Sequence, residues 1–285
     1  MRKHPFSILL LIFTVIIFLL PLWLLVSQAL IPSFDAMLVT LFAEPVRLVP
    51  VPLASEQFHL LFARRADLPG IICRDTLYCL LSSAVQVLVS VICGYMLAKY
   101  RSRFTKRTVL LYTMTLVLPM QMFLIPVYRI TEWVGAAGDP LFICLMAAFS
   151  PLGAILMRQV FLKMPDEWAE CFRMEDTRMS RMLLHIVFPA GLPAACILFL
   201  FSFVEMWSMI EQPLLLITDK ARYPLSMLLF DMRTKEPDVI FAASLVALAP
   251  AVILLLAGTA VFVICHHHAI RNNGTGITEP ELNQK

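Results

Sequence analysis

Charged residues are scarce in this sequence. Only 15% of its 285 residues are Asp, Glu, Lys or Arg, whereas 60% are hydrophobic, and the mean hydropathy is +0.81. A water-soluble domain of this length cannot bury so large an apolar fraction. The formal net charge of +3 is small, so the composition gives no indication of nucleic-acid binding. It predicts an integral membrane protein.

The motifs of several enzyme classes are also missing. No GxxxxGK[ST] occurs among the nine glycines, which argues against a P-loop nucleotide site. HExxH and GxSxG are absent too, which argues against a zinc protease or a serine hydrolase. We therefore expect no catalytic activity and no cofactor.

Paired cysteines are lacking as well. None of the seven cysteines forms a CxxC pair, so we expect small buried side chains and neither a disulfide framework nor a zinc site. His266–His268 could ligate a metal, but we interpret this triplet as a polar stop after the last apolar run. We expect no metal site.

Long apolar runs are present, and they divide the chain. One membrane-crossing helix needs about 20 apolar residues. Lipid offers no hydrogen-bond partners to backbone N–H and C=O groups, so we expect these runs to be helical. The sequence thus predicts an all-α polytopic membrane protein with about six transmembrane helices. The runs are Phe6–Val26, Thr76–Ala98, Thr108–Tyr128, Pro140–Met157, Ala190–Pro213 and Val239–Cys265. Prolines inside the runs predict kinks: Pro119, Pro126, Pro151 and Pro250.

Basic residues predict the orientation. They gather in Lys99–Arg107 and in residues 158–189, and an excess of Lys and Arg marks cytoplasmic loops. Both ends of the chain are then expected in the cytoplasm. The first run exceeds the roughly 7–15 apolar residues of a signal peptide, so we expect an uncleaved span.

The expected organisation has four parts. Residues 1–30 hold the first transmembrane helix with a cytoplasmic amino terminus. Residues 31–75 form an extracytoplasmic segment with a short helix near Ser55–Arg65. Residues 76–270 form the main transmembrane domain, and residues 271–285 a polar cytoplasmic tail.

The segment 163–189 differs from an ordinary connector. Pro165 suits the first turn of a helix, and Thr177 can cap a second one. Apolar residues then follow at helical spacing, with Arg178, Arg181 and His185 mostly on the other side. This pattern predicts a short helix, a turn and an amphipathic helix on the inner membrane face. By itself it is equally compatible with a simple connection between two spans. The apolar positions are Met179, Met182, Leu183, Ile186 and Val187.

The spacing in this segment resembles the inner loop of ABC importer permeases. Their loop reads Pro-x-x-x-x-Glu-Ala-Ala, then x-x-Asp-Gly-Ala, then about nine residues and Ile-x-x-Pro. In this chain the two alanines after the glutamate are replaced by Cys171 and Phe172, and the glycine is replaced by Asp176. Asp tolerates the left-handed turn of that glycine better than most residues. The corresponding residues are Pro165, Glu170, Cys171, Phe172, Glu175, Asp176, Thr177, Ile186 and Pro189.

Other parts of the chain are similar to the carbohydrate-uptake branch, which includes maltose and glycerol-phosphate permeases. That branch usually has a Trp-Asn pair in the fifth span, where this chain has Trp207 and Ser208. The remaining similar segments are Leu118-Pro119, Ile125–Tyr128, Trp133–Gly135, Arg158–Phe161, Ser202-Phe203 and Pro213-Leu214.

The resemblance implies a fold, a site and partners. The fold would be that of a type I ABC importer permease in a bacterial inner membrane. The chain would form half of a solute pathway with a sister permease, and an external binding protein would deliver the solute. Two cytoplasmic ATPase subunits would receive the inner loops of the two permeases, and in this chain the inner loop is the 163–189 loop. The docking residues would be Glu170, Cys171, Phe172, Asp176, Thr177, Ile186 and Pro189.

Two acidic residues interrupt the fifth apolar run. A carboxylate at membrane depth usually faces a cavity or a partner. Glu211 is expected near the outer surface, in water. Glu205 lies deeper, where it either lines the pathway with Trp207 and Ser208 or bonds to a helix of the sister subunit.

The main alternative function is an ion-coupled secondary transporter. Such a protein often shows inverted repeats with ionisable residues at the midplane, and neither is evident here. The sequence does not identify the solute.

Overall fold

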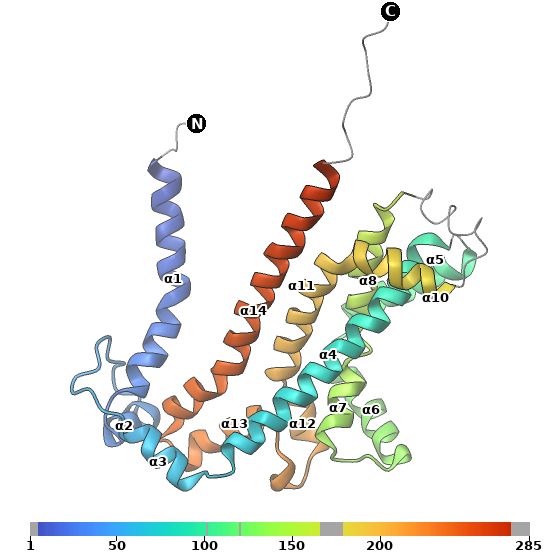
Figure 1. The fold of residues 1–285 in the computed structure, drawn as a ribbon. Coiled ribbons are helices and arrows are strands. Elements are labelled where there is room, and N and C mark those ends of the chain that lie inside the picture. Colours follow the sequence, from blue (N-terminus) through green and yellow to red (C-terminus); the bar gives the residue numbers. More distant parts are fainter. Residues whose placement is uncertain (1–4, 101, 120, 166–178, 275–285) are drawn as a thin grey trace, which may run out of the picture. The chain divides into compact units, whose positions relative to one another are not determined.

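The computed structural model describes residues 5–100, 102–119, 121–165 and 179–274 (Figure 1). All regular structure in these ranges is helical. Among the described residues, four helices are long and apolar enough to cross a membrane, or up to six if each bent pair counts as one span. The predicted all-α membrane class is confirmed.

Within the described ranges most consecutive helices are joined by short connections, and a longer loop at residues 43–55 separates α2 from α3. A π-helical turn at Leu183–Val187 and a 3-10 turn at Lys220–Arg222 complete the regular structure of the described ranges. The α-helices are α1 (Pro5–Ala29), α2 (Ser33–Phe42), α3 (Glu56–Arg64), α4 (Leu68–Lys99), α5 (Arg103–Val117), α6 (Gln121–Val134), α7 (Pro140–Ala147), α8 (Pro151–Leu162), α10 (Met179–Met182), α11 (Phe188–Trp207), α12 (Glu211–Leu216), α13 (Leu225–Lys235) and α14 (Ile240–Gly274).

Proline breaks the third and fourth apolar runs. A residue before proline disfavours the helical region, and both Leu118 (ψ 136°) and Ser150 (ψ 128°) are extended. Helices α5 and α6 are therefore bent by 107°, and α7 and α8 by 40°. The kinks predicted at Pro119 and Pro151 are confirmed, as complete breaks of the helix.

Other helix boundaries differ from the apolar runs. Helix α4 begins at Leu68, eight residues before the expected Thr76, and α14 continues to Gly274, beyond Cys265. The fifth run is divided, because α11 ends at Trp207 and α12 is separate. The short helix expected near Ser55–Arg65 is confirmed as α3. Helices α2 and α13 were not predicted, since both lie outside the long apolar runs.

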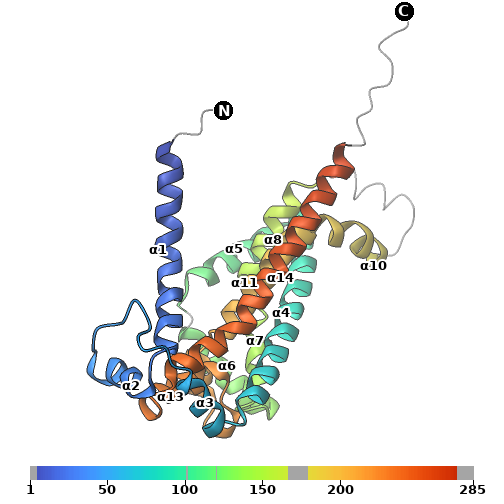
Figure 2. The ribbon, with the colours of Figure 1, turned by 60° about the vertical axis from the view of Figure 1, so that its left-hand side comes forward.

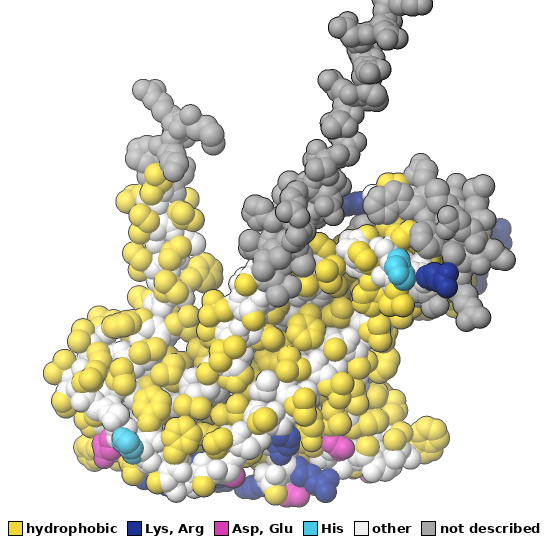
Figure 3. All heavy atoms as spheres, viewed as in Figure 1, with side chains coloured by type: hydrophobic (Ala, Val, Ile, Leu, Met, Phe, Trp, Pro, Cys, Tyr) yellow, Lys and Arg dark blue, Asp and Glu magenta, His cyan; other side chains and the backbone are white. Residues whose placement is uncertain are grey.

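The chain divides into two compact units. The first comprises Met1–Asp75 and Tyr223–Pro250, and the second comprises Thr76–Arg222 and Ala251–Lys285. Helix α1 belongs to the first unit, and its residues from Ile8 to Leu22 are exposed in this chain. Figure 3 shows hydrophobic side chains covering this helix, as expected for a surface that faces lipid or another subunit.

Polar contacts hold the first unit together between segments that are far apart in the sequence. Arg65 forms an ion pair with Glu236, and Arg64 forms one with Asp238 at 2.9 Å. The hydrogen bond from Arg65 to Glu236 raises the pKa of Arg65 above its usual value, so the guanidinium stays charged. These contacts join the 31–75 segment to the residues just before α14.

Small residues set the helix spacing in the second unit. A Cβ atom on Gly94 of α4 would lie 2.6 Å from the Cβ of Met157 on α8. A Cβ on Gly191 of α11 would lie 2.9 Å from the ring of Phe161 on the same α8. Close approach through glycine is typical of helices that pack inside membranes. Helix α8 is thus held tightly between α4 and α11, and this three-helix contact carries the site described next.

Candidate functional site

The central part of the candidate loop, residues 166–178, lies outside the described residues. The predicted docking residues Glu170, Cys171, Phe172, Asp176 and Thr177 fall there, so their placement stays a prediction. Ile186 and Pro189 are described. The structure also shows both arms of the loop, which are the end of α8 on one side and α10 with the π turn on the other.

The first arm is fixed to the end of α4 by two cationic side chains. Lys99 Nζ donates a hydrogen bond to the carbonyl oxygen of Met164 at 2.5 Å. Arg158 Nε donates to the carbonyl oxygen of Leu97 at 3.2 Å. Hydrogen bonds from charged donors are stronger than neutral ones. They fix the point at which the chain leaves α8 and enters the loop.

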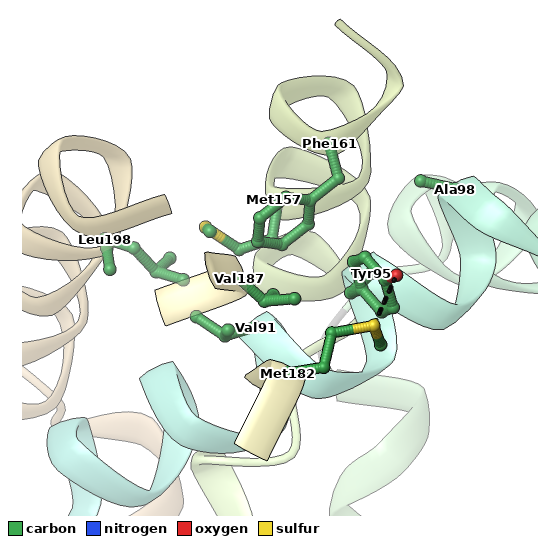
Figure 4. Close-up of a cluster of buried hydrophobic side chains, with 9 residues drawn as sticks. Val91, Tyr95, Ala98, Met157, Phe161, Met182, Val187 and Leu198 are labelled. Carbon is green, nitrogen blue, oxygen red and sulfur yellow. Dashed lines mark hydrogen bonds between the residues drawn. The ribbon is translucent and has the colours of Figure 1, made fainter. Parts of the chain in front are cut away.

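The second arm is fixed by a buried apolar cluster (Figure 4). Tyr95 of α4 and Phe161 of α8 pack edge to face, with ring centroids 5.7 Å apart. Met182 of α10 lies against them, and its sulfur accepts a hydrogen bond from the Tyr95 hydroxyl at 3.6 Å. Both arms of the loop therefore meet on α4. The other buried members are Val91, Ala98, Met157, Val187, Ala195 and Leu198.

The predicted amphipathic helix is confirmed where it is described. Met182 and Val187 are buried, Ile186 is half-buried, and Arg181 and His185 are exposed. The helix does not stop before the fifth span, however; it enters α11 through the π turn.

Pro189 explains why the turn widens at this point. It lacks a backbone N–H, and its ring crowds the carbonyl of the residue four positions earlier, which is His185. A π turn accommodates such a residue without breaking the helix. Movement of the loop can thus pass directly into α11, because the backbone between them stays helical.

The three candidate pathway residues fall near the end of α11. Glu205 and Ser208 are exposed, whereas Trp207 is half-buried. The Trp207 ring stacks on Phe203, with centroids 5.6 Å apart and planes inclined by 14°. Ser208 Oγ donates a hydrogen bond to the carbonyl oxygen of Val204 at 2.8 Å and so satisfies a group at the helix end. Glu205 and Ser208 are therefore available to a solute or a partner, while Trp207 also contributes to packing within the chain.

Glu211 behaves as expected for an acid outside the apolar interior. Its side chain is exposed, and its Oε2 atom accepts a hydrogen bond from Gln121 Nε2 at 2.9 Å. This contact links α12 to α6.

Sequence reasoning missed the α4 side of the site. The two arms are anchored by Tyr95, Lys99 and Arg158. Of these, only Arg158 lies in a segment that is similar to carbohydrate-uptake permeases. An aromatic residue and a lysine at one end of an apolar run are typical of a membrane interface. Tyr95 and Lys99 form such a pair at the end of α4, so this pattern could have identified them. Within the described part of the chain, no group of three His, Cys, Asp or Glu residues could hold a metal ion.

The helices and their broken spans define a polytopic α-helical membrane protein. Residues 90–271 match the family described as "Binding-protein-dependent transport system inner membrane component". The chain belongs to this family, and it is a multi-pass component of a bacterial inner membrane.

Relatives within the family are distant. The chain is 25% identical over 183 residues to the sn-glycerol-3-phosphate transport system permease protein UgpE of Shigella flexneri serotype 5b (strain 8401). The same protein of Escherichia coli (strain K12) is also 25% identical over 183 residues. These matches cover 62% of this chain, and the chain spans 65% of the length of these relatives.

A solved structure shares the fold. It is described as a bacterial ABC transporter involved in the import of the acidic polysaccharide alginate. The TM-score is 0.71 at 16% identity, over 89% of this chain and 94% of that one. The fold is that of an ABC importer permease, as the resemblance predicted.

Proposed function

We propose that this chain is a permease subunit of an ATP-driven importer. It forms half of the translocation pathway with a sister permease. Two cytoplasmic ABC ATPase subunits bind the inner loops of the two permeases, and in this chain the inner loop is the 163–189 loop. An extracytoplasmic binding protein delivers the solute. Family membership and the loop pattern support these assignments. The chain itself is not an enzyme, and ATP hydrolysis belongs to the ATPase partners.

The anchoring of the loop arms carries this proposal. Met164 on one arm and Met182 on the other both contact α4, through Lys99 and Tyr95 respectively. Close-packed interiors transmit displacement because they compress little. A push on the loop therefore moves α4, α8 and α11 together, which is the rigid-body motion that alternating access needs.

The residues between the arms would make the ATPase contact. We expect Glu170, Cys171 and Phe172 to supply the first part of this contact, followed by Asp176 and Thr177. Ile186 and Pro189 then act at its base, where they connect the contact surface to α11.

We propose a sugar or a related polar solute as the cargo. Two lines of similarity support this class: relatives named for sn-glycerol-3-phosphate transport, and a solved structure described as an alginate importer. Glu205 and Ser208 are exposed polar groups in an otherwise apolar helix, so they are candidates to meet the solute along with Trp207. An aromatic face and a few hydrogen-bonding groups are a usual combination in ligand sites.

The proposal is tested by ATP hydrolysis. The purified chain alone should hydrolyse no ATP. The complex formed with the cognate sister permease and ATPase subunits should do so, and the loaded binding protein should stimulate it. Hydrolysis by the contaminant-free chain alone, or failure to form that complex, would contradict the assignment.

A further inference from the structure

An apolar loop in the first unit runs beside the end of α1. Residues 43–55 contain no helix or strand, and Figures 1 and 2 show the loop rising next to the carboxyl-terminal part of α1. Within it, a run of aliphatic side chains is exposed. These are Val46 (48% exposed), Leu48 (62%), Val49 (63%), Val51 (65%) and Leu53 (73%).

Hydrogen bonds fix the depth of this loop relative to α1. Trp23 Nε1 donates to the carbonyl oxygen of Leu48 at 2.9 Å. Ser27 Oγ and Gln28 Nε2 both donate to the carbonyl oxygen of Arg47 at 2.7 Å. The apolar run of α1 ends just before Ser27, and Trp23 lies four residues earlier, roughly 6 Å along the helix axis. Leu48 is therefore held at the level where the span meets the interface, a level at which Trp is enriched.

Part of the loop backbone needs no water to satisfy its polar groups. Non-helical backbone is expensive in lipid because its polar groups lack partners. Here side chains of α1 satisfy the carbonyls of Arg47 and Leu48, as just described. Three residues of the loop also have no N–H to satisfy; they are Pro45, Pro50 and Pro52.

The single cation of the 45–53 stretch is neutralised locally. Arg47 forms an ion pair with Asp35 at 2.8 Å, and its guanidinium also donates to the carbonyl oxygen of Val51 at 2.9 Å. The loop thus presents aliphatic side chains outward while its charge is turned toward α2. An exposed aliphatic surface next to a spanning helix, with its charge paired, is the arrangement expected of a segment in contact with lipid.

We infer that residues 46–53 insert into the lipid interface at the carboxyl end of α1. Their occupant is the bilayer itself, because the loop continues the apolar surface of the spanning helix and is pinned to it at interfacial depth. Such a contact would fix the height and rotation of α1 in the membrane. The inference rests on the membrane insertion of α1 and does not depend on transport activity.

Site-specific photo-crosslinking in native membranes tests this inference. p-Benzoylphenylalanine replaces Val51 or Leu53 in the full chain, expressed with its partner subunits. His59 on the exposed side of α3 serves as the matched control outside the loop, and Phe18 on α1 reports that the photochemistry works. After irradiation, mass spectrometry identifies whether lipid or protein has been attached.

The expected result is lipid attached at positions 51 and 53 and none at position 59. Attachment of a protein subunit at 51 and 53 would overturn the inference, because the loop would then be a protein interface. The absence of any adduct at both positions, with an adduct formed at position 18, would also overturn it, because the loop would then face water.

Discussion

Gly94 determines how closely α4 and α8 approach. In Gly94→Ala the new Cβ would lie 2.6 Å from the Met157 Cβ and 2.8 Å from the backbone nitrogen of Arg158. Backbone atoms cannot rotate away, so the helices must separate, at a cost of about 1–3 kcal/mol. Alanine has a higher helix propensity than glycine by roughly 1 kcal/mol, which opposes this cost in part. We still expect a lower melting temperature for the purified variant than for the parent.

The matched control for this substitution is Gly70→Ala in the same helix. Nothing lies within 4 Å of the corresponding Cβ position, so this variant should be as stable as the parent or slightly more stable. Equal melting temperatures for the two variants would show that the α4–α8 contact is looser than the structure indicates.

Phe172 and Glu170 carry a second prediction at the residue scale. The family that the loop resembles has alanine at the Phe172 position, and a phenylalanine buries about 150–250 Å² when covered. Phe172→Ala should therefore leave a void that weakens ATPase binding by roughly 3–5 kcal/mol in a rigid site. Glu170→Ala should leave a basic group of the ATPase buried and unpaired. This should weaken ATPase binding by roughly several kcal/mol.

Co-purification of a tagged ATPase measures both effects. Each loop variant should lose ATPase association and transport while its membrane insertion stays normal. Glu281→Ala, in the predicted tail, is the control and should behave as the parent. Wild-type association of both loop variants would show that this loop is not the docking element.

Helical spacing explains which site residues the sequence could reveal. It correctly placed Met182 and Val187 on the buried side, because residues three to four positions apart share a helix face. The partner of Met182 is Tyr95, which is 87 positions away, and no local pattern contains that contact. Trp207 was predicted as a pathway residue, yet it also stacks on Phe203 one turn earlier.

At the scale of helices, proline marked possible breaks without distinguishing them. Pro119 lies just after the end of α5, and Pro151 is the first residue of α8. In contrast, Pro126 lies within α6 and Pro250 within α14. In membranes, neighbouring helices and side chains can satisfy the carbonyl freed by proline. That outcome depends on tertiary neighbours, so the sequence predicts the candidates and the fold selects among them.

The connection between α3 and α13 depends on a partly buried ion pair. The side chains of Arg65 and Glu236 are 27% and 16% exposed, whereas Arg129 and Glu132, a pair on α6, are 77% and 40% exposed. Removing only Arg65 leaves the Glu236 carboxylate with reduced solvation and no cation. A double-mutant cycle on Arg65 and Glu236 should therefore give a coupling energy on the order of 1–3 kcal/mol.

The exposed pair provides the comparison. The cycle on Arg129 and Glu132 should give about 0.5 kcal/mol or less, because water screens both charges. Unfolding of the purified protein in detergent, followed at increasing denaturant, measures both cycles. Similar coupling in the two pairs would contradict the assigned role of Arg65 and Glu236.

For the whole molecule, the charge distribution predicts the sidedness of the loops. Single-cysteine variants of a cysteine-free chain test it in intact cells. An impermeant thiol reagent should label Lys220→Cys in intact cells. It should label Met174→Cys only after the membrane has been permeabilised. Labelling of position 174 from outside would reverse the topology and remove the proposed ATPase contact.

The molecular class was predictable because it depends on composition and on spacings that the family retains. The division into two units was not predictable. It arises from contacts such as Arg64 with Asp238, which join residues 174 positions apart. Hydrophobicity says little about such pairs, since they occur between polar groups outside the spans.

The energy source for transport can be measured directly as uptake into proteoliposomes. The complete complex is reconstituted with ATP enclosed on the ATPase side and loaded binding protein on the other. We expect uptake that requires hydrolysable ATP, continues when ionophores abolish all ion gradients, and stops when this chain is omitted. Uptake by this chain alone, driven by a proton or sodium gradient without ATPase subunits, would instead identify a secondary transporter.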